Sequence, residues 1–400
     1  MKLVVINQPL RNHGDEAAHR AFIRALLDAL PQCSIRLPMI KCRPEDIEPF
    51  RVDDRRVEYV WIDTASDRIF NKVTKRAMQL GLPFRKTLCR LSPSCRAIMK
   101  EFENGDVVIC APGGTCLGVQ QNWGHLAMMR MAAESGRPLA YWGRSIGPFP
   151  QETLSQKMFY RNAVRCLRSC GFVSLRDRRS MEMAAALGIR ATEVTDSAFL
   201  EAVPEVPRDA YAVFVPNVLS SMAGFRELPR ERSAAFFGKV LDEILREFDG
   251  KIVMLPQLFG QGEWDDAPFF EEIASGRERV SVLPDSCPSD TQQKIVGGAR
   301  FLVGARYHSM IFALNTGTPF IAFSYEHKIS GLLEILGLQQ RMTDLQNGAF
   351  DSASSEEAVL EDFRGKLKKI YSLPMISREN AARPAVEGLR KLISFINEKV

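Results

Sequence analysis

The chain has 400 residues, 46% of them hydrophobic and 25% charged, which is typical of a soluble globular protein with two or three domains. Its net charge of +5 at pH 7 is too small to indicate a nucleic-acid-binding protein, but it suits anionic substrates or transient contact with a membrane surface. No run of about 18 apolar residues predicts a membrane span, and the first ten residues are interrupted too soon for a secretory signal. The 9 cysteines form no CxxC pair, which favours reduced thiols in a cytosolic protein over a zinc site.

The N-terminal segment predicts a strand followed by a helix. Residues 3–6 are an apolar run typical of a buried strand, and a polar loop follows. Apolar side chains then recur at helical spacing over residues 18–30, so we expect Asp15 or Glu16 to open an amphipathic helix. Asp15 is equally well interpreted as a helix cap. Gly14 would let this loop approach a ligand closely.

The next segment, residues 41–105, is the least regular part of the chain. Strands are predicted at 34–40 and 57–62. Residues 69–80 and 88–102 have helical spacing and many lysines and arginines. We interpret this segment as a solvated basic face, and the alternative is a loop that binds an acceptor substrate.

A pair of glycines follows the strand predicted for residues 106–110. Gly113 and Gly114 stand between a strand and a helix, where glycine permits a tight turn and close backbone approach to a ligand. Neither GxGxxG nor GxxxxGK[ST] occurs in the chain, so a nicotinamide or ATP site has no motif support. The next strand, 139–142, leads into a shaped loop rich in glycine and proline.

Strands alternate with helices in the rest of the chain, which predicts the fold class α/β with parallel sheets. Two α/β halves of similar size are expected side by side, with a cleft between them. The Pro-containing, charged stretch 204–208 is the candidate linker. The predicted organisation is an N-terminal domain over 1–203, this linker, a C-terminal domain over 209–355 and C-terminal helices over 356–400.

The stretch 301–335 carries the most informative pattern. Residues 301–304 predict a buried strand, and Arg306 and His308 stand at its C-terminal end, directly before a helix expected from Met310. Ligands of parallel α/β sheets bind at that edge. An arginine beside a helix N-terminus predicts an anion site, and His308 adds a titratable group.

The chain resembles the polysaccharide pyruvyl transferase family. The resemblance covers residues 1 to about 338 and depends on an ordered set of short motifs. These are NHGDE (12–16), APGG (111–114), SIGP (145–148), SLRD (174–177) with Ser180, TDSAF (195–199), RYHS (306–309), GTP (317–319) and SYEHK (324–328). Two departures leave donor and acceptor identity open: Tyr307 stands where the family more often has Leu, and Ser197 where it often has Pro.

The resemblance implies two facing Rossmann-like domains, similar to the two-domain GT-B glycosyltransferases, with C-terminal helices packing across. It implies transfer of a pyruvyl group from phosphoenolpyruvate to two hydroxyls of a sugar, with formation of a cyclic ketal and release of phosphate. Phosphoenolpyruvate is then the donor substrate, and neither a further cofactor nor a metal is expected. The acceptor is a sugar or a lipid-linked glycan precursor.

Roles for individual residues follow from this resemblance and from the chemistry. Arg306 and Arg176, one from each half, would bind the phosphate and carboxylate of the donor. His308 would be the general acid, with protonation of phosphate as its alternative role, and Asp196 and Asp15 are candidate bases. The remaining predicted substrate contacts are Tyr307, Ser309, Gly113, Gly114, Gly14, Glu326 and Lys328.

Other functions stay open at this point. One is a glycosyltransferase that uses a nucleotide sugar on the same scaffold, and another is a non-catalytic member of a polysaccharide assembly pathway. We expect a cytoplasmic protein, located in the cell interior or at the inner face of the membrane, with at most peripheral membrane contact. No nucleic-acid partner is expected, and homo-oligomer formation is left open.

Overall fold

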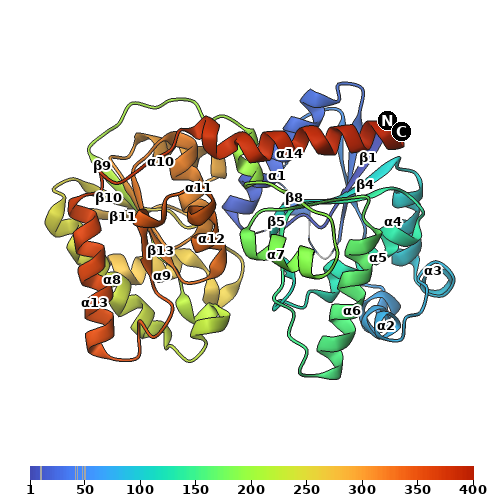
Figure 1. The fold of residues 1–400 in the computed structure, drawn as a ribbon, viewed down its shortest axis with the longest axis horizontal. Coiled ribbons are helices and arrows are strands. Elements are labelled where there is room, and N and C mark those ends of the chain that lie inside the picture. Colours follow the sequence, from blue (N-terminus) through green and yellow to red (C-terminus); the bar gives the residue numbers. More distant parts are fainter. Residues whose placement is uncertain (10, 41, 43, 47, 49–50) are drawn as a thin grey trace. The chain divides into compact units, whose positions relative to one another are not determined.

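Two parallel sheets organise the chain (Figure 1). The computed structural model describes residues 1–9, 11–40, 42, 44–46, 48 and 51–400. Unit 1 holds the N-terminal strand, Ala18–Glu201 and Arg383–Val400, whereas unit 2 holds Arg11–Ala17 and Ala202–Ala382. The predicted linker at 204–208 therefore begins shortly after the chain passes into unit 2.

The sheet of unit 1 has the strand order of a Rossmann fold. Its order is β3-β2-β1-β4-β6-β7-β8, with every pair parallel and β5 beside β6. The strands are β1 (Lys2–Ile6), β2 (Ser34–Met39), β3 (Val57–Trp61), β4 (Val107–Cys110), β5 (Gly113–Leu117), β6 (Leu139–Ile146), β7 (Phe172–Leu175) and β8 (Thr192–Glu193).

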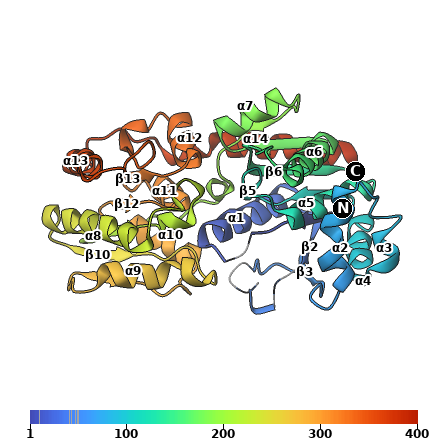
Figure 2. The ribbon, with the colours of Figure 1, turned by 90° about the horizontal axis from the view of Figure 1, so that it is seen from below.

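Alternating side chains bury both faces of this sheet. Val4 and Ile6 of β1 join one core with α2 to α7, while Leu3 and Val5 join another with α1 and the end of α14. Figure 2 shows α2, α3 and α4 gathered beside β2 and β3. The helices are α1 (His13–Ala29), α2 (Arg68–Gln79), α3 (Leu88–Leu91), α4 (Pro93–Glu103), α5 (Trp123–Glu134), α6 (Leu154–Ser169), α7 (Arg178–Ala186) and α14 (Arg378–Lys399).

Unit 2 repeats this order in a six-stranded parallel sheet, β11-β10-β9-β12-β13-β14. Its strands are β9 (Tyr211–Val215), β10 (Lys251–Met254), β11 (Val280–Val282), β12 (Leu302–Gly304), β13 (Phe320–Ser324) and β14 (Met342–Asp344). Its helices are α8 (Arg230–Glu247), α9 (Asp266–Ala274), α10 (Ser289–Gly298), α11 (Tyr307–Thr316), α12 (His327–Ile335) and α13 (Ala353–Lys368). Phe236 on α8 packs edge-on against Phe323 of β13, which ties this helix to the sheet.

No helix in the described part of the chain is both long and apolar enough to cross a membrane. The predicted fold class is confirmed: both units are α/β with parallel sheets.

Several predicted element boundaries were wrong at helix starts. Helix α1 begins at His13, before Asp15, because the Asn12 side-chain oxygen accepts hydrogen bonds from the backbone N–H groups of Gly14 (2.8 Å) and Asp15 (3.2 Å). Helix α11 begins at Tyr307 and not at Met310. The motif RYHS therefore forms the cap and first turn of the helix.

The APGG motif (111–114) also has a different structure from the turn that was predicted there. Residues 113–117 form strand β5, and β6 continues to Ile146 where a loop was expected. The helix predicted over 88–102 is split, because the Ser92 hydroxyl accepts from Cys95 N (3.0 Å) and Pro93 starts a new helix. The helical C-terminal region is likewise interrupted between α13 and α14.

Candidate functional site

Polar side chains follow the three central strands of unit 2 at the same level. Phe214 of β9 is in register with Met254 of β10 and Val303 of β12. Three residues beyond this row stand Asn217, Gln257 and Arg306. The strand order reverses between β9 and β12, and this switch point is where open parallel sheets bind ligands.

These three side chains are buried, yet their polar groups are incompletely satisfied. Exposure is 0% for Asn217, 1% for Gln257 and 7% for Arg306. The Asn217 amide oxygen and nitrogen, the Gln257 Nε2 and the Arg306 Nε have no hydrogen-bond partner among the described residues. Buried polar groups are normally paired, so a cluster of such atoms indicates a place where a polar ligand completes the pairing.

Asp266 fixes the orientation of the Arg306 guanidinium. The Asp266 Oδ1 forms an ion pair with the Arg306 Nη2, and its Oδ2 accepts the backbone N–H groups of Gln257 and Leu258, both at 2.9 Å. Asp266 is completely buried as the first residue of α9. Sequence reasoning missed it, since it belongs to none of the short motifs.

The first turn of α11 carries the other residues of the RYHS motif. Arg306 is the N-cap residue, and the Ser309 hydroxyl donates to the Arg306 carbonyl oxygen (2.6 Å), so Ser309 stabilises the turn. The rings of Tyr307 and His308 meet edge to face, with 5.1 Å between centroids. The positive end of the α11 helix dipole favours negative charge beside Arg306.

Gly14 lies directly against the His308 imidazole. A Cβ atom at Gly14 would overlap the His308 ring, so the position accepts only glycine. Backbone pairing places Gly14 there: His13 N–H donates to the Gln257 carbonyl (2.9 Å), and Asn12 forms an antiparallel bridge with Leu258. We expected Gly14 to permit close approach to a ligand, whereas the close neighbour in the structure is the histidine.

The NHGDE motif is held to α10 by a buried carboxylate. Glu16 is fully buried and accepts hydrogen bonds from the Ser289 hydroxyl (2.9 Å) and backbone N–H (3.2 Å). A second contact joins Glu16 Oε2 to His13 Nδ1 at 2.7 Å. Asp15, the predicted base, is partly buried in this same helical turn.

The SYEHK motif forms the end of β13 and the start of α12. Lys328 Nζ lies 2.5 Å from Glu326 Oε1 and above the Tyr325 ring, 5.9 Å from its centroid. Burial raises the pKa of Tyr325 to about 12, although the positive charges of Lys328 and Arg306 act in the opposite direction. Burial also opposes ionisation of Glu326, but the charge and hydrogen bond of Lys328 outweigh it and lower its pKa.

Two predicted site residues of unit 1 are engaged with each other. Arg176 Nη1 lies 2.6 Å from Asp196 Oδ2, and the exposure of the two side chains is 3% and 1%. The other Asp196 oxygen accepts from Ala198 N (2.9 Å), which caps the short 3-10 helix Ser197–Leu200. These contacts favour a structural role for the Asp196 carboxylate.

The glycine motif of unit 1 borders a buried arginine. Gly113 has φ of 152°, and a Cβ atom there would lie 2.7 Å from Arg144 Nη2, whereas Gly114 has open space around it. Arg144 and His125 line a pocket of about 380 Å³. Burial, and then the charge of Arg144, lower the pKa of His125 well below its usual value. Arg144 was not among the predicted site residues, and its signal was its place in the motif-like loop 143–149.

The structure thus distributes the predicted site residues over both units. Unit 2 contains Arg306, Tyr307, His308, Ser309, Gly14, Asp15, Glu326 and Lys328, and unit 1 contains Arg176, Asp196, Gly113 and Gly114. Contacts within unit 2 bring Gly14, His308 and Tyr307 together. The residues that were missed are Asp266, Asn217 and Gln257 in unit 2 and Arg144 in unit 1. Asn217 and Gln257 each follow a proline at a strand end, which is the only local signal of their position.

Solved structures with a similar fold cover nearly the whole chain. A UDP-GlcNAc 2-epimerase from Methanocaldococcus jannaschii aligns with a TM-score of 0.55 and 10% identity, over 98% of this chain and 100% of that one. UGT89C1 from Arabidopsis thaliana, solved with UDP, aligns with a TM-score of 0.56 and 12% identity, over 99% of each chain. The chain therefore has the fold of GT-B glycosyltransferases and epimerases.

Sequence comparison identifies the family. The amylovoran biosynthesis protein AmsJ of Erwinia amylovora is 25% identical over 234 residues, which cover 53% of this chain and 55% of AmsJ. The chain thus spans about half the length of this relative. The sequence model for polysaccharide pyruvyl transferase matches residues 12–327, from the NHGDE motif to the SYEHK motif. The chain belongs to the polysaccharide pyruvyl transferase family.

Proposed function

We propose that this protein transfers a pyruvyl group from phosphoenolpyruvate to two hydroxyls of a sugar during polysaccharide biosynthesis. Family membership and the name of the relative AmsJ support this proposal. The single observation that carries it is the Arg306 guanidinium, buried beside a helix N-terminus with its Nε unpartnered among the described residues.

The donor would bind at the C-terminal edge of the sheet in unit 2. Phosphoenolpyruvate carries a phosphate and a carboxylate, and both accept charge-assisted hydrogen bonds from guanidinium and backbone N–H groups. Arg306, already oriented by Asp266, would offer its Nε, and the N-terminus of α11 would add the positive end of its helix dipole. The Asn217 amide nitrogen and Gln257 Nε2 would supply neutral donors at the same level.

His308 would act as the general acid. It would donate a proton to the methylene carbon of the donor while a first sugar hydroxyl adds to the central carbon and loses its proton to a base. Phosphate would then leave, and the second hydroxyl would add to the same carbon and give its proton to the departing phosphate, so that the ring closes as a cyclic ketal. Asp15, in the helical turn that holds Gly14 against His308, is the proposed base.

Calorimetric titration tests the donor assignment. Purified full-length protein is titrated with phosphoenolpyruvate and, separately, with uridine and guanosine diphosphates. We expect saturable binding of phosphoenolpyruvate that weakens about ten- to a hundredfold in Arg306→Lys, because lysine keeps the charge but loses the fork of donors. Arg300→Lys, at an exposed arginine before β12, is the matched control and is expected to bind normally.

The same titrations distinguish the alternatives. Binding of a nucleoside diphosphate without phosphoenolpyruvate would favour a glycosyltransferase, and normal donor affinity in Arg306→Lys would contradict the anion site. For catalysis, His308→Asn is expected to lower kcat by about a hundredfold or more while KM for phosphoenolpyruvate changes little. Full turnover in that variant would rule out His308 as the acid.

A further inference from the structure

The segment from Arg68 to Lys100 concentrates positive charge on unit 1. It contains nine Lys and Arg residues and no Asp or Glu, although the whole chain has a net charge of only +5. The rest of the chain is therefore net negative. All nine basic side chains are exposed. Such an asymmetry exceeds what solubility requires and indicates a surface that meets negative charge.

Helix α2 presents the first part of this surface. Its exposed residues include Arg68, Lys72, Lys75 and Arg76, which recur at helical spacing, together with Asn71 and Val73. Its opposite face, which includes Phe70 and Met78, is buried in the core of unit 1. The helix is thus fixed with four basic side chains directed to solvent.

Exposed leucines follow these basic side chains in the sequence. Of the nine large hydrophobic residues that are exposed in the described part of the chain, five lie between Trp61 and Leu91. Leu80 is 72% exposed and Leu91 63% exposed, and Arg90 adjoins Leu91 in sequence. Phe84 and Leu88 are buried in the same core as α2, so the loop and α3 are packed and their exposed leucines are held outward.

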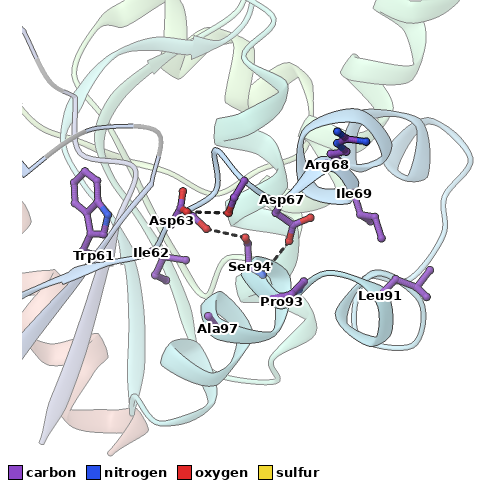
Figure 3. Close-up of a pocket in the computed structure, with 11 residues that line it drawn as sticks. Trp61, Ile62, Asp63, Asp67, Arg68, Ile69, Leu91, Pro93, Ser94 and Ala97 are labelled. Carbon is purple, nitrogen blue, oxygen red and sulfur yellow. Dashed lines mark hydrogen bonds between the residues drawn. The ribbon is translucent and has the colours of Figure 1, made fainter.

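Leu91 lines a groove of about 560 Å³, as Figure 3 shows. Trp61 stands at one end and Leu91 at the other, with Ile69 along the side. Two carboxylates lie in the wall of the groove, and both already accept hydrogen bonds from neighbouring residues. Asp67 accepts from Phe70 N (2.9 Å), Ser92 Oγ (2.6 Å) and Ser94 N (3.0 Å), and Asp63 accepts from Ala65 N and Ser66 Oγ, both at 2.8 Å.

We infer that the exposed side chains of residues 61–91, here called the α2–α3 patch, bind the surface of an anionic lipid bilayer. Lysine and arginine attract acidic headgroups, and exposed leucine and tryptophan insert at the boundary with the acyl chains. The paired presence of both residue types favours a bilayer over an anionic polymer. A single-stranded nucleic acid would be bound by several stacked aromatics, and Trp61 is the only exposed aromatic residue in the patch.

This interaction is independent of the proposed reaction. Its experiment is flotation of the full-length protein with vesicles of phosphatidylcholine alone or mixed with phosphatidylglycerol. We expect flotation only with the anionic vesicles, and release at high salt, because screening weakens the attraction between exposed charges. Each basic side chain near the membrane surface is expected to change the partition coefficient of the protein between water and vesicles about fivefold.

Two triple variants and two controls test the patch itself. Lys72→Gln/Arg76→Gln/Lys86→Gln and Leu80→Ser/Leu82→Ser/Leu91→Ser are expected to lose flotation, the first by about a hundredfold. Arg390→Gln/Lys391→Gln/Lys399→Gln removes the same charge from exposed positions of α14, and Leu154→Ser removes an exposed leucine elsewhere. Both controls should float like the parent protein.

The proposal is overturned if the protein does not float with anionic vesicles. It is equally overturned if the charge variant of the patch and its control on α14 lose flotation to the same extent. It is also overturned if the protein binds heparin but not the vesicles, since the partner would then be an anionic polymer. All substituted side chains are exposed, and unchanged thermal unfolding confirms that a loss is not caused by misfolding.

Discussion

At the scale of single residues, the His308 imidazole is positioned by backbone and not only by side chains. The absent side chain of Gly14 leaves the space that the ring occupies, and the Tyr307 ring meets it edge-on. The ion pair with Asp266 likewise fixes the position of the Arg306 guanidinium. The groups proposed to bind and protonate the donor are therefore oriented before any ligand arrives, which is a condition for efficient catalysis.

Gly14→Ala is expected to lower turnover strongly without unfolding the protein. The added methyl group would overlap the His308 ring and displace either the ring or the start of α1. A displacement of about 1 Å in catalytic geometry can cost about a hundredfold in kcat. Steady-state kinetics with phosphoenolpyruvate measure the loss.

Gly365→Ala is the control for this prediction. Gly365 is exposed on α13, and a Cβ atom there meets nothing within 4 Å. Its activity should equal that of the parent protein. If Gly14→Ala were equally active, Gly14 would not hold His308 in place.

At the scale of elements, the start of α1 is bound to unit 2 by long-range contacts. Glu16 accepts the N–H of Ser289, the first residue of α10, so a carboxylate from α1 caps a helix that lies 273 residues further along the chain. A negative charge at a helix N-terminus is stabilising. The same carboxylate contacts His13, whose neighbour Gly14 lies against His308.

Glu16→Gln is expected to loosen this attachment. The amide removes the negative charge and places a donor group against the Ser289 donors, which should cost about 1–3 kcal/mol of local stability. Hydrogen exchange of residues 11–17 and of the α10 start should accelerate, and turnover should fall with it. Glu278→Gln, at an exposed position of unit 2, should change neither. Unchanged exchange in Glu16→Gln would contradict the capping role.

At the scale of the whole molecule, both units use the same strand order, and in unit 1 buried side chains pack on both faces of the sheet. A fully buried histidine in unit 1 makes the stability of the protein depend on pH in the acidic range. His19 is 1% exposed, and neither ring nitrogen has a hydrogen-bond partner among the described residues. Burial, and then the charge of Arg20, lower the pKa of His19 from 6.5 to about 4.

Stability should therefore fall as the pH is lowered from 6.5 to 4. In this window the unfolded chain binds a proton at His19 and the folded chain does not, so protonation favours unfolding, by up to about 3 kcal/mol below pH 4. Urea unfolding at several pH values measures the slope. His19→Leu should reduce it, and His125, whose pKa is also lowered, should account for part of the remainder. If the free energy of unfolding depended on pH equally in the parent protein and in His19→Leu, His19 would not be responsible for the loss of stability.

Local sequence patterns predicted most of the strands and helices. They also predicted the part of the candidate site that contains Arg306 and His308. The strands predicted at 106–110 and 301–304 are found at 107–110 and 302–304, because strands of a covered parallel sheet are marked by apolar runs. Arg306 and His308 were predicted because a strand, two polar residues and a helix are contiguous in the chain. Helix starts were less accurate, since they depend on single caps such as Asn12.

The amino-acid sequence alone predicts the α/β class, the alternation of strands and helices, and a candidate anion-binding motif after β12. What only the tertiary structure decided is which distant residues complete that motif. Asn217 and Gln257 join Arg306 through strand register, Asp266 reaches it from α9, and Gly14 reaches His308 across 294 positions of the chain. The physical reason is that local patterns report burial and backbone preference, whereas pairing between distant segments depends on the strand order and packing of the complete fold.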